Sequence, residues 1–396
     1  MKTVQIKDDI FWVGVNDHET TLFEGMWPIA QDGVAYNAYV INDEKVAVID
    51  TVKSFKQGEY IEKIKSIIGD KKVDYLIVNH MEPDHSSSIA DLLAVYPDMQ
   101  IIGNAKTFPI MKNFYDIDTN LMQVADGDSL KLGKHELQFY MTPMVHWPES
   151  MVTYDATDKV LFSMDVFGSF GNTDGSIFDD ENDLKAFEDN TRRYYACIVG
   201  KVSGPAQKAL QKLGPLDIQM ICPSHGLIWR SNVGYIVDFY DRMSRYETEE
   251  GVVIAYGSMY GNTLHSAELL AGYLKEAGVK TVKLFDVSKT DISYIVSDMW
   301  KYKGLILGAP AYYGRIFPKM ANLLYKIEEI GIKNHKLGFF TDFSWSNGAD
   351  RYFEGFIQAA KADVVGEMVN VQGYANAEDE AKLKALAQAM ADAVRA

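Results

Sequence analysis

The second half of the chain alternates short apolar runs with amphipathic segments in a regular order. Runs rich in β-branched and aromatic residues predict strands at 252–258, 281–287, 304–310, 336–342 and 364–371. The spacing of apolar residues predicts helices at 262–278, 293–302, 317–331 and 350–362, and a last Ala-rich helix. Five strands with intervening helices predict an α/β fold, a doubly wound five-stranded parallel sheet.

The first half, up to about residue 245, follows a different pattern that begins rich in β-strands. Residues 36–51 read as a hairpin with a polar turn at Asn42, Asp43 and Glu44, and a further β pair is predicted at 135–142 and 150–167. Strands and helices alternate between these hairpins. The charged segment 241–251 separates the two patterns, so we predict domains at 1–248 and 251–396.

Composition narrows the classes of function. A chain of 396 residues is too long for one ordinary core, and its net charge of −16 argues against general binding to nucleic acid or anionic membranes. Two cysteines, Cys197 and Cys222, cannot build a disulfide framework, a zinc ribbon or an iron–sulfur cluster. The N-terminus has no apolar signal core and no run reaches membrane-spanning length, so the expected location is cytoplasmic.

One short turn carries an unusual number of ligand-type side chains. The stretch VNHMEPDHSSS (78–88) contains His80, Glu82, Asp84 and His85 between a predicted buried strand and a predicted capped helix. Alternation at the strand end would aim His80, Glu82 and Asp84 to one side. Such groups converging in a cavity are costly without a cation, so a metal site is favoured over a hydrated polar turn in which Asp84 caps the helix.

Three loops of the second half fall at the carboxyl ends of predicted strands, where ligands of such sheets bind. The loop 258–263 (SMYGNT) offers backbone N–H groups at a helix start and hydroxyls at Ser258 and Thr263, which suits an anion. It contains no Lys or Arg, so a nucleoside triphosphate site is disfavoured. The loops 309–315 and 342–350 add aromatic residues, Tyr312, Tyr313 and Trp345, that suit stacking on a flat ring.

Residues 251–396 resemble flavodoxin, and the resemblance implies FMN. The phosphate would lie in the loop of Ser258, Met259, Tyr260, Gly261, Asn262 and Thr263. The isoalloxazine would be held by Pro310, Ala311, Tyr312, Tyr313 and Gly314 and by Ser344, Trp345, Ser346, Asn347 and Gly348. FMN is preferred to FAD because one phosphate cradle is visible without a dinucleotide fingerprint.

The sequence HMEPDH (80–85) resembles the metal motif of the metallo-β-lactamase superfamily, His-x-His-x-Asp-His, with Glu82 in place of the second histidine. The resemblance implies an αββα sandwich. A carboxylate adds hard oxygen and negative charge, which suits iron better than a zinc hydrolase site. Further ligand candidates at matching positions are His146, Asp165 and His225, each at the end of an apolar strand-like run.

A metallo-β-lactamase-like domain followed by a flavodoxin-like domain is the architecture of flavodiiron proteins (A-type flavoproteins). The family resemblance implies two non-haem irons per chain. One would be held by His80, Glu82 and His146, the other by Asp84, His85 and His225, and Asp165 would bridge them. The histidine equivalent to His85 swings away from the metal in some members, so His85 is the least secure ligand.

The implied reaction is reductive: FMN passes electrons to the diiron centre, which reduces dioxygen to water or nitric oxide to nitrous oxide. The sequence has no Cys-x-x-Cys pairs, so we expect no fused rubredoxin and a separate electron donor, either a rubredoxin-like protein or a reduced cofactor. In this family a head-to-tail homodimer, in some cases a dimer of dimers, brings the FMN of one subunit beside the iron of the other. Trp147 is a candidate to line that junction.

Two other classes of function stay open, a zinc hydrolase with an accessory flavodoxin domain and an electron carrier or redox sensor with a vestigial metal site. Tyr194 and Tyr195 are candidates to donate a proton near the metals, with simple packing as the alternative. Some family members have a histidine where Gln31 and Asp32 stand, which leaves the preference between dioxygen and nitric oxide open. We expect the remaining histidines to lie on the surface or on helix faces: His18, His135, His265 and His335.

Overall fold

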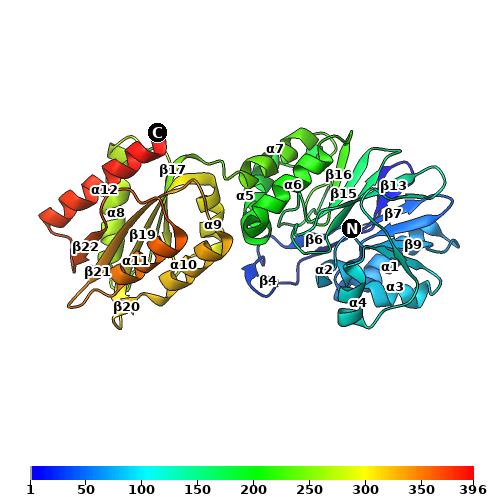
Figure 1. The fold of residues 1–396 in the computed structure, drawn as a ribbon, viewed down its shortest axis with the longest axis horizontal. Helices are drawn as coiled ribbons and strands as arrows, with labels where there is room; N and C mark the ends of the chain where they lie inside the picture. The colour runs from blue at the N-terminus through cyan, green and yellow to red at the C-terminus, as the bar shows by residue number, and fades with distance from the viewer. Residues whose placement is uncertain (1) are drawn as a thin grey trace. The chain divides into compact units, whose positions relative to one another are not determined.

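The computed structural model describes residues 2–396, which divide into two compact units, residues 2–244 and 245–396 (Figure 1). The division falls in the charged segment that separates the two sequence patterns. No helix in the described range is both long and apolar enough to cross a lipid bilayer.

The first unit is a sandwich of two β-sheets. The larger sheet has the order β1-β2-β7-β8-β9-β10-β11: β1 (Val4–Lys7), β2 (Ile10–Trp12), β7 (Tyr39–Asn42), β8 (Val46–Ile49), β9 (Tyr75–Ile77), β10 (Gln100–Gly103) and β11 (Leu121–Gln123). The smaller sheet has the order β12-β13-β14-β15-β16: β12 (Ser129–Lys131), β13 (Glu136–Met141), β14 (Met151–Asp155), β15 (Val160–Met164) and β16 (Met220–Pro223).

The core of this unit lies between the two sheets. Ile41 and Ile77 of the larger sheet and Phe139 and Phe162 of the smaller sheet belong to one buried apolar cluster, which also contains Cys222. The predicted hairpin is present, because β7 pairs antiparallel with β8 across the turn at 43–45.

Helices border both sheets, so the αββα expectation is confirmed. Figure 1 shows α1, α3 and α4 beside the larger sheet and α6 and α7 beside the smaller one. The helices of this unit are α1 (Gln57–Ile68), α2 (Pro83–Ser86), α3 (Ile89–Val95), α4 (Thr107–Tyr115), α5 (Leu184–Tyr194), α6 (Ser203–Leu213) and α7 (Val233–Ser244). Two small ribbons complete it: β3 (Val15–Asp17) with β6 (Val34–Tyr36), and β4 (Leu22–Phe23) with β5 (Trp27–Pro28).

The helix predicted after the ligand-rich turn is present as α3, and an additional short helix, α2, lies within the turn. Proline favours the first turn of a helix, and α2 begins at Pro83, inside the ligand-rich turn. The second helix, α3, begins at Ile89. Ser88 does not cap α3 through its side chain; its hydroxyl donates instead to the carbonyl oxygen of Val52, at 2.7 Å.

The second unit confirms the predicted doubly wound parallel sheet. Its strands have the order β18-β17-β19-β21-β22, all parallel: β17 (Glu249–Tyr256), β18 (Val282–Asp286), β19 (Tyr302–Tyr312), β21 (Lys336–Phe343) and β22 (Val369–Gln372). A short antiparallel strand, β20 (Arg315–Ile316), pairs with the end of β19. The last strand begins at Val369 rather than at 364, because Gly366 has a φ of 67° that is incompatible with an extended strand.

Five helices cover this sheet: α8 (Asn262–Glu276), α9 (Ile292–Lys301), α10 (Pro318–Ile330), α11 (Ala349–Ala360) and α12 (Ala377–Arg395). Figure 1 shows α8 and α12 together on one face and α9, α10 and α11 on the other. Apolar residues of α8 and α12, such as Leu270 and Leu386, pack with Ile254 and Ile306 of the central strands. The carboxyl ends of the parallel strands are thereby left for the loops singled out in the sequence.

Candidate metal centre and flavin cavity

The seven predicted metal ligands of the first unit converge from the ends of four strands. The turn after β9 carries four of them. His146 lies in the loop between β13 and β14, Asp165 directly follows β15, and His225 follows β16. Buried apolar strands hold these loops, so the convergence follows from the sandwich itself.

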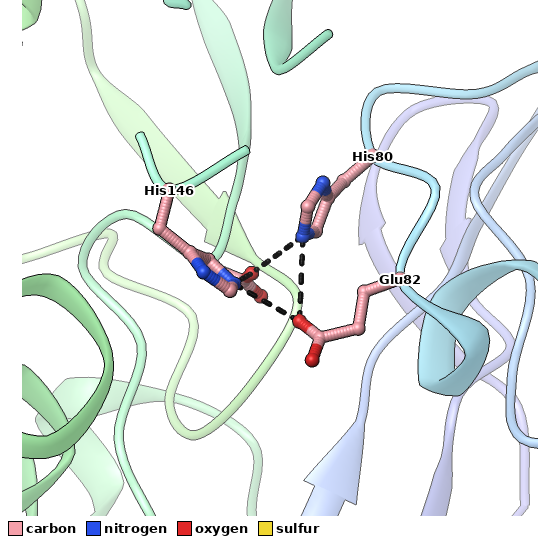
Figure 2. A group of neighbouring side chains, drawn as sticks. His80, Glu82 and His146 are labelled. Atoms are coloured by element: carbon pink, nitrogen blue, oxygen red, sulfur yellow. Dashed lines mark hydrogen bonds and ion pairs between the residues drawn. The ribbon is translucent and has the colours of Figure 1, made fainter. Parts of the chain in front are cut away.

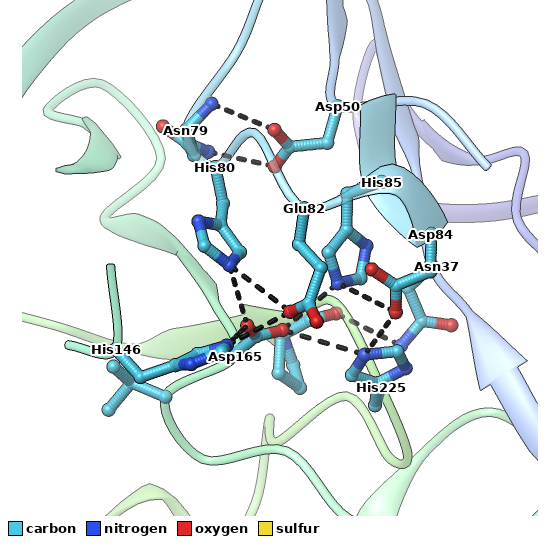
Figure 3. Close-up of polar contacts among 12 residues, drawn as sticks. Asn37, Asp50, Asn79, His80, Glu82, Asp84, His85, His146, Asp165 and His225 are labelled. Atoms are coloured by element: carbon cyan, nitrogen blue, oxygen red, sulfur yellow. Dashed lines mark hydrogen bonds and ion pairs between the residues drawn. The ribbon is translucent and has the colours of Figure 1, made fainter. Parts of the chain in front are cut away.

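The first group of side chains comprises His80, Glu82 and His146, labelled in Figure 2, and one oxygen of Asp165, labelled in Figure 3. Nε2 of His146 lies 2.9 Å from Oε2 of Glu82, and Nε2 of His80 lies 3.4 Å from the same oxygen. Oδ2 of Asp165 is 3.3 Å from His80 Nε2 and 3.2 Å from His146 Nε2. Their ligand atoms all lie within 4.8 Å of one another, close enough to share one metal ion.

The second group comprises Asp84, His85 and His225 (Figure 3). Oδ2 of Asp84 lies 3.4 Å from His85 Nε2 and 3.3 Å from His225 Nε2. The other oxygen of Asp165, Oδ1, faces this group at 3.0 Å from His85 Nε2 and 3.5 Å from His225 Nε2. One carboxylate therefore presents a different oxygen to each of two adjacent groups.

The expectation that His80, Glu82 and Asp84 share one side is wrong for Asp84. The extended alternation ends at Glu82, because the helical turn α2 begins at Pro83 and redirects the next side chains. Asp84 and His85 consequently join His225, whereas Glu82 stays with His80. The change from strand to helix is what divides the turn between two groups.

The charges of the first group favour a cation. Burial disfavours a charge on His80, but the adjacent carboxylates of Glu149 and Glu82 more than compensate and raise the pKa of His80 to about 10. His146 is also buried, and Asp165 and Glu82 raise its pKa to about 10. A field that holds protons on two buried imidazoles at neutral pH also attracts a metal ion, which would displace those protons.

The second group behaves in the same way. Burial opposes the charge of His85, yet Asp84 and Asp165 raise its pKa to about 9. Burial likewise opposes the charge of Asp165, but His85 and His146 keep its pKa well below the usual range of a carboxyl. Ionised carboxylates are the form in which these residues bind metal ions.

Several buried polar atoms of the site lie near oppositely charged groups but form no well-aligned hydrogen bond. Among residues 2–396, these are both carboxylate oxygens of Asp84, Oδ2 of Asp165 and Nε2 of His225. Buried polar atoms are nearly always paired, so these atoms fit metal ligands. Imidazole nitrogens together with three carboxylates suit iron, and the residues therefore fit the expected diiron pair.

A third group of similar side chains, His135, Asp155 and Asp158, lies at the hairpin of β14 and β15. Nδ1 of His135 is 2.8 Å from Oδ2 of Asp155, and Asp155 and Asp158 raise the pKa of this buried imidazole against the effect of burial. The His135–Asp155 pair forms a buried hydrogen bond outside the two groups of predicted ligands. His135 was predicted to lie on the surface or a helix face, and that prediction is wrong.

His335 is also buried, with its ring nitrogens 2.6 Å from the carbonyl oxygens of Lys333 and Met299. The prediction that His335 lies on the surface or a helix face is therefore also wrong. Its ring can be buried because backbone carbonyl groups lie at hydrogen-bond distance from both of its nitrogens. His18 is exposed, and His265 lies on α8 and stacks on Tyr374 with ring centroids 4.3 Å apart.

Aromatic residues surround the metal groups. The Trp147 ring packs edge-on against His80 at 5.3 Å, and Tyr194 lies 5.4 Å from the His225 ring and is fully buried. Tyr195 points elsewhere, since its hydroxyl is 2.9 Å from that of Ser203. Tyr194 is thus the tyrosine of the pair that borders the site. The carboxylate of Asp32 is engaged by Arg193 at 3.2 Å.

The second unit contains a cavity of about 710 Å³ at the carboxyl ends of its strands. Most of the predicted flavin-binding residues line it: Met259, Tyr260, Asn262, Thr263, Pro310, Ala311, Tyr312, Tyr313, Gly314, Ser344, Trp345 and Ser346. At its rim, Tyr260, Tyr313 and Trp345 are 92%, 91% and 91% exposed. Large exposed aromatic side chains at the rim of a cavity can stack on a flat ring bound there.

Four predicted residues do not line the cavity but shape its loops. The Ser258 hydroxyl accepts from the N–H groups of Gly261, at 3.1 Å, and Leu264, at 3.4 Å. Gly261 has a φ of 101° and directly precedes α8. The side-chain oxygen of Asn347 accepts from the N–H of Ala349, at 3.2 Å, and a Cβ on Gly348 would lie 2.1 Å from the carbonyl oxygen of Gly314.

The cavity also contains residues that sequence reasoning missed, namely Asp342, Phe343 and Gly373. Asp342 and Phe343 end β21, within the segment 342–350 that drew attention for its aromatic residue. Oδ2 of Asp342 lies 3.4 Å from Oγ1 of Thr263, and burial raises the pKa of Asp342. Gly373 follows β22, and no local signal in the sequence marks it as part of a site.

Comparisons with known proteins agree with both halves of the structure. Residues 34–226 match the ODP family beta lactamase model and residues 254–385 match the flavodoxin model. A nitric oxide reductase of Moorella thermoacetica is 34% identical over 92% of each chain. An anaerobic nitric oxide reductase flavorubredoxin of Salmonella paratyphi B is 34% identical over 88% of this chain and 73% of its own.

Solved structures are similar over the full length. The rubredoxin oxygen:oxidoreductase of Desulfovibrio gigas has a TM-score of 0.96 and 31% identity, covering 100% of this chain and 99% of its own. The flavodiiron protein of Giardia intestinalis has a TM-score of 0.94 and 27% identity, covering 100% and 97% of the two chains.

Proposed function

This chain belongs to the flavodiiron family and is an oxidoreductase that uses FMN and a non-haem diiron site; on that premise, we propose that it reduces dioxygen to water, nitric oxide to nitrous oxide, or both. The observation that carries the proposal is Asp165, whose two oxygens face two adjacent groups of metal ligands. The names of its relatives include both substrates.

We assign one iron to His80, Glu82 and His146 and the other to Asp84, His85 and His225, with Asp165 as the bridge. The support is the grouping of ligand atoms within 4.8 Å and the buried atoms of Asp84, Asp165 and His225 that form no well-aligned hydrogen bond. Three carboxylates give a charge of −3 against +4 for two ferrous ions, which leaves room for one hydroxide. When bound, FMN and the two irons store and deliver the electrons that the reaction consumes.

The protein residues position and shield this chemistry. His80, His85 and His225 are fully buried, so bulk water has little access from their side. Tyr194, buried against His225, carries a hydroxyl whose pKa burial and the nearby Asp165 raise well above its usual value. It therefore keeps its proton at neutral pH, and we assign it the role of a hydrogen-bond donor at the edge of the site.

For FMN, we assign the phosphate to the loop 258–263 and the ring to the aromatic rim. The N–H groups at the start of α8 and the hydroxyl of Thr263 provide donors, and the helix N-terminus favours an anion. Tyr312, Tyr313 and Trp345 lie along the cavity that would hold the ring. Electrons would come from a separate donor, a rubredoxin-like protein or a reduced cofactor.

We further propose that the working unit is a head-to-tail dimer. Apolar side chains are exposed around each site: Tyr260, Tyr313 and Trp345 at the flavin cavity, and Met26, Phe114 and Met144 in the first unit. Met144 lies two residues before His146, and the Phe114 ring is 6.2 Å from Trp147. Such residues are costly in water and are typical of surfaces that another chain covers.

The test of the proposed function uses the full-length protein, purified without oxygen. We expect about two irons and one FMN per chain, and consumption of dioxygen or nitric oxide when a chemical reductant supplies electrons. An oxygen or nitric oxide electrode measures consumption, and gas chromatography measures nitrous oxide. Zinc in place of iron, with hydrolase activity and no gas consumption, would contradict the proposal.

The dimer is tested by mixing two inactive variants. A His80→Ala chain lacks iron in its first group, and a chain with a disrupted 258–263 loop lacks FMN. A mixed dimer then holds one intact FMN facing one intact iron pair on the other chain. Turnover that is absent from both parents and present in the mixture supports transfer between subunits; an inactive mixture with verified subunit exchange contradicts it.

A further inference from the structure

Glu149 connects the two loops that carry the first group of metal ligands. It lies three residues after His146, and its Oε1 accepts hydrogen bonds from Nδ1 of His80, at 2.8 Å, and from the N–H of Met81, at 2.9 Å. One carboxylate oxygen thus joins the loop 142–150 to the turn that follows β9. This inference rests on the ligand assignment proposed above.

The surroundings of Glu149 restrict its movement. The side chains of both Glu149 and His80 are 0% exposed. The Asn104 amide donates to the backbone carbonyl of Glu149, and the N–H of Thr142 donates to the carbonyl of Ser150 at 2.9 Å. These bonds fix the backbone around Glu149, and the N–H of Met81 fixes its Oε1, so the carboxylate restrains the orientation of the His80 ring.

The hydrogen bond also determines which nitrogen of His80 is free. A neutral imidazole carries one N–H, and the carboxylate requires that proton on Nδ1. Nε2 is then the unprotonated nitrogen, and it lies 3.3 Å from Asp165 Oδ2 and 3.4 Å from Glu82 Oε2. A carboxylate behind an imidazole also increases the basicity of the ligating nitrogen.

The two histidines of the second group have weaker support. Nδ1 of His225 lies 2.8 Å from the neutral carbonyl oxygen of Ala35. Nδ1 of His85 has no hydrogen-bond partner within the described part of the chain. The first group therefore has a charged supporting residue, whereas the second group has one neutral supporting group and one unsupported ring.

We propose that Glu149 is a positioning residue that orients His80 toward the first metal position and makes the two irons unequally bound. The iron of His80, Glu82 and His146 is held more tightly than that of Asp84, His85 and His225. This difference in iron affinity follows from the group that accepts a hydrogen bond from Nδ1 of each histidine.

The experiment measures iron affinity rather than turnover. Metal-depleted full-length protein is titrated with ferrous ion without oxygen, in competition with a chelator. We expect two affinities in the original chain. Glu149→Ala should weaken the tighter one by about 10–100-fold, the range expected for loss of a residue that supports a metal-binding histidine, and should leave FMN content unchanged.

Glu149→Gln separates charge from position. Its amide oxygen can replace Oε1, which accepts both hydrogen bonds, so the ring stays oriented while the negative charge is lost. We expect a smaller loss of affinity than in Glu149→Ala. This isosteric change also keeps the test valid if the alanine variant fails to fold.

The chain provides a matched control in Asp155→Asn. His135 and Asp155 form a second buried histidine–carboxylate pair, also 2.8 Å apart and 0% exposed, outside the two proposed iron groups. We expect Asp155→Asn to lower the melting temperature without changing either iron affinity. Unchanged iron affinities in both Glu149 variants, or an equal loss in the control, would overturn the inference. Absence of iron from the original chain would instead contradict the proposed function.

Discussion

Asp165 faces His85 through Oδ1, 3.0 Å from Nε2, and keeps its second oxygen for the opposite group of ligands. No other carboxylate of the two groups lies within reach of both. Its burial means that water cannot take over this role. The proposed iron pair therefore depends on Asp165 more than on any single histidine.

Replacing Asp165 by Asn should remove iron from both positions. The amide has the size of the original side chain but carries no charge. Its NH2 group, which cannot bind a metal ion, replaces the oxygen that faces one of the two ligand groups. We expect less than about one iron per chain, loss of gas reduction and full FMN content, because the flavin cavity lies in the other unit. Metal analysis and the visible spectrum measure both cofactors. Normal turnover by an iron-depleted variant would contradict the assignment.

Glu82 should decide which metal the site prefers. Its Oε2 lies 2.9 Å from His146 Nε2, where a zinc enzyme of the same fold would have an imidazole. We expect Glu82→His to raise the ratio of bound zinc to iron in cells grown with equal amounts of both, because nitrogen ligands suit zinc. Glu62→His, an exposed position on α1, controls for the added imidazole. An unchanged ratio would show that other residues select iron.

Gly261 should be required for FMN binding. Its φ of 101° is unfavourable for any other residue, although a Cβ there would meet no protein atom within 4 Å. Strain of this kind costs about 1–3 kcal/mol, so Gly261→Val should weaken FMN roughly tenfold or more. Gly272→Val on the exposed side of α8 adds the same side chain without positive φ and should leave FMN affinity unchanged. Flavin fluorescence measures both.

Asp342 should make the FMN-free second unit less stable as pH rises. Its folded pKa is raised, so the folded state holds a proton that the unfolded state releases above about pH 4. The stability that this raised pKa contributes to the folded state is fully present below the pKa of Asp342 in the unfolded chain. It is lost as the pH rises through the pKa of Asp342 in the folded chain. Asp342→Asn removes this dependence.

We therefore expect the variant to gain stability over the original chain as the pH rises above about 4. Urea unfolding of the FMN-free full-length protein at several pH values measures the difference. Thr263→Val, which removes the hydroxyl 3.4 Å from Asp342 but no charge, should keep the pH dependence. A constant difference across this range would show that the carboxyl does not titrate there.

The sequence by itself determined the elements and the identity of the chemical groups. Strand–helix alternation from 252 onward is a local property of apolar spacing, and it led to the parallel sheet that the structure contains. The turn 78–88 and the loop 258–263 are equally local, since their ligand-type residues lie within a few positions. Resemblance to known motifs then linked distant residues such as His146 and His225.

Only the tertiary structure decided how those groups face one another. Asp84 separated from Glu82 because a helical turn began between them, and His135 became buried because Asp155 lies opposite it. Glu149 contacts His80, and Gly373 lines the flavin cavity, because loops distant in the sequence meet in the folded chain. Hydrogen-bond partners depend on strand register and loop packing between segments far apart in the chain. The local spacing of apolar residues does not determine which distant segments come into contact.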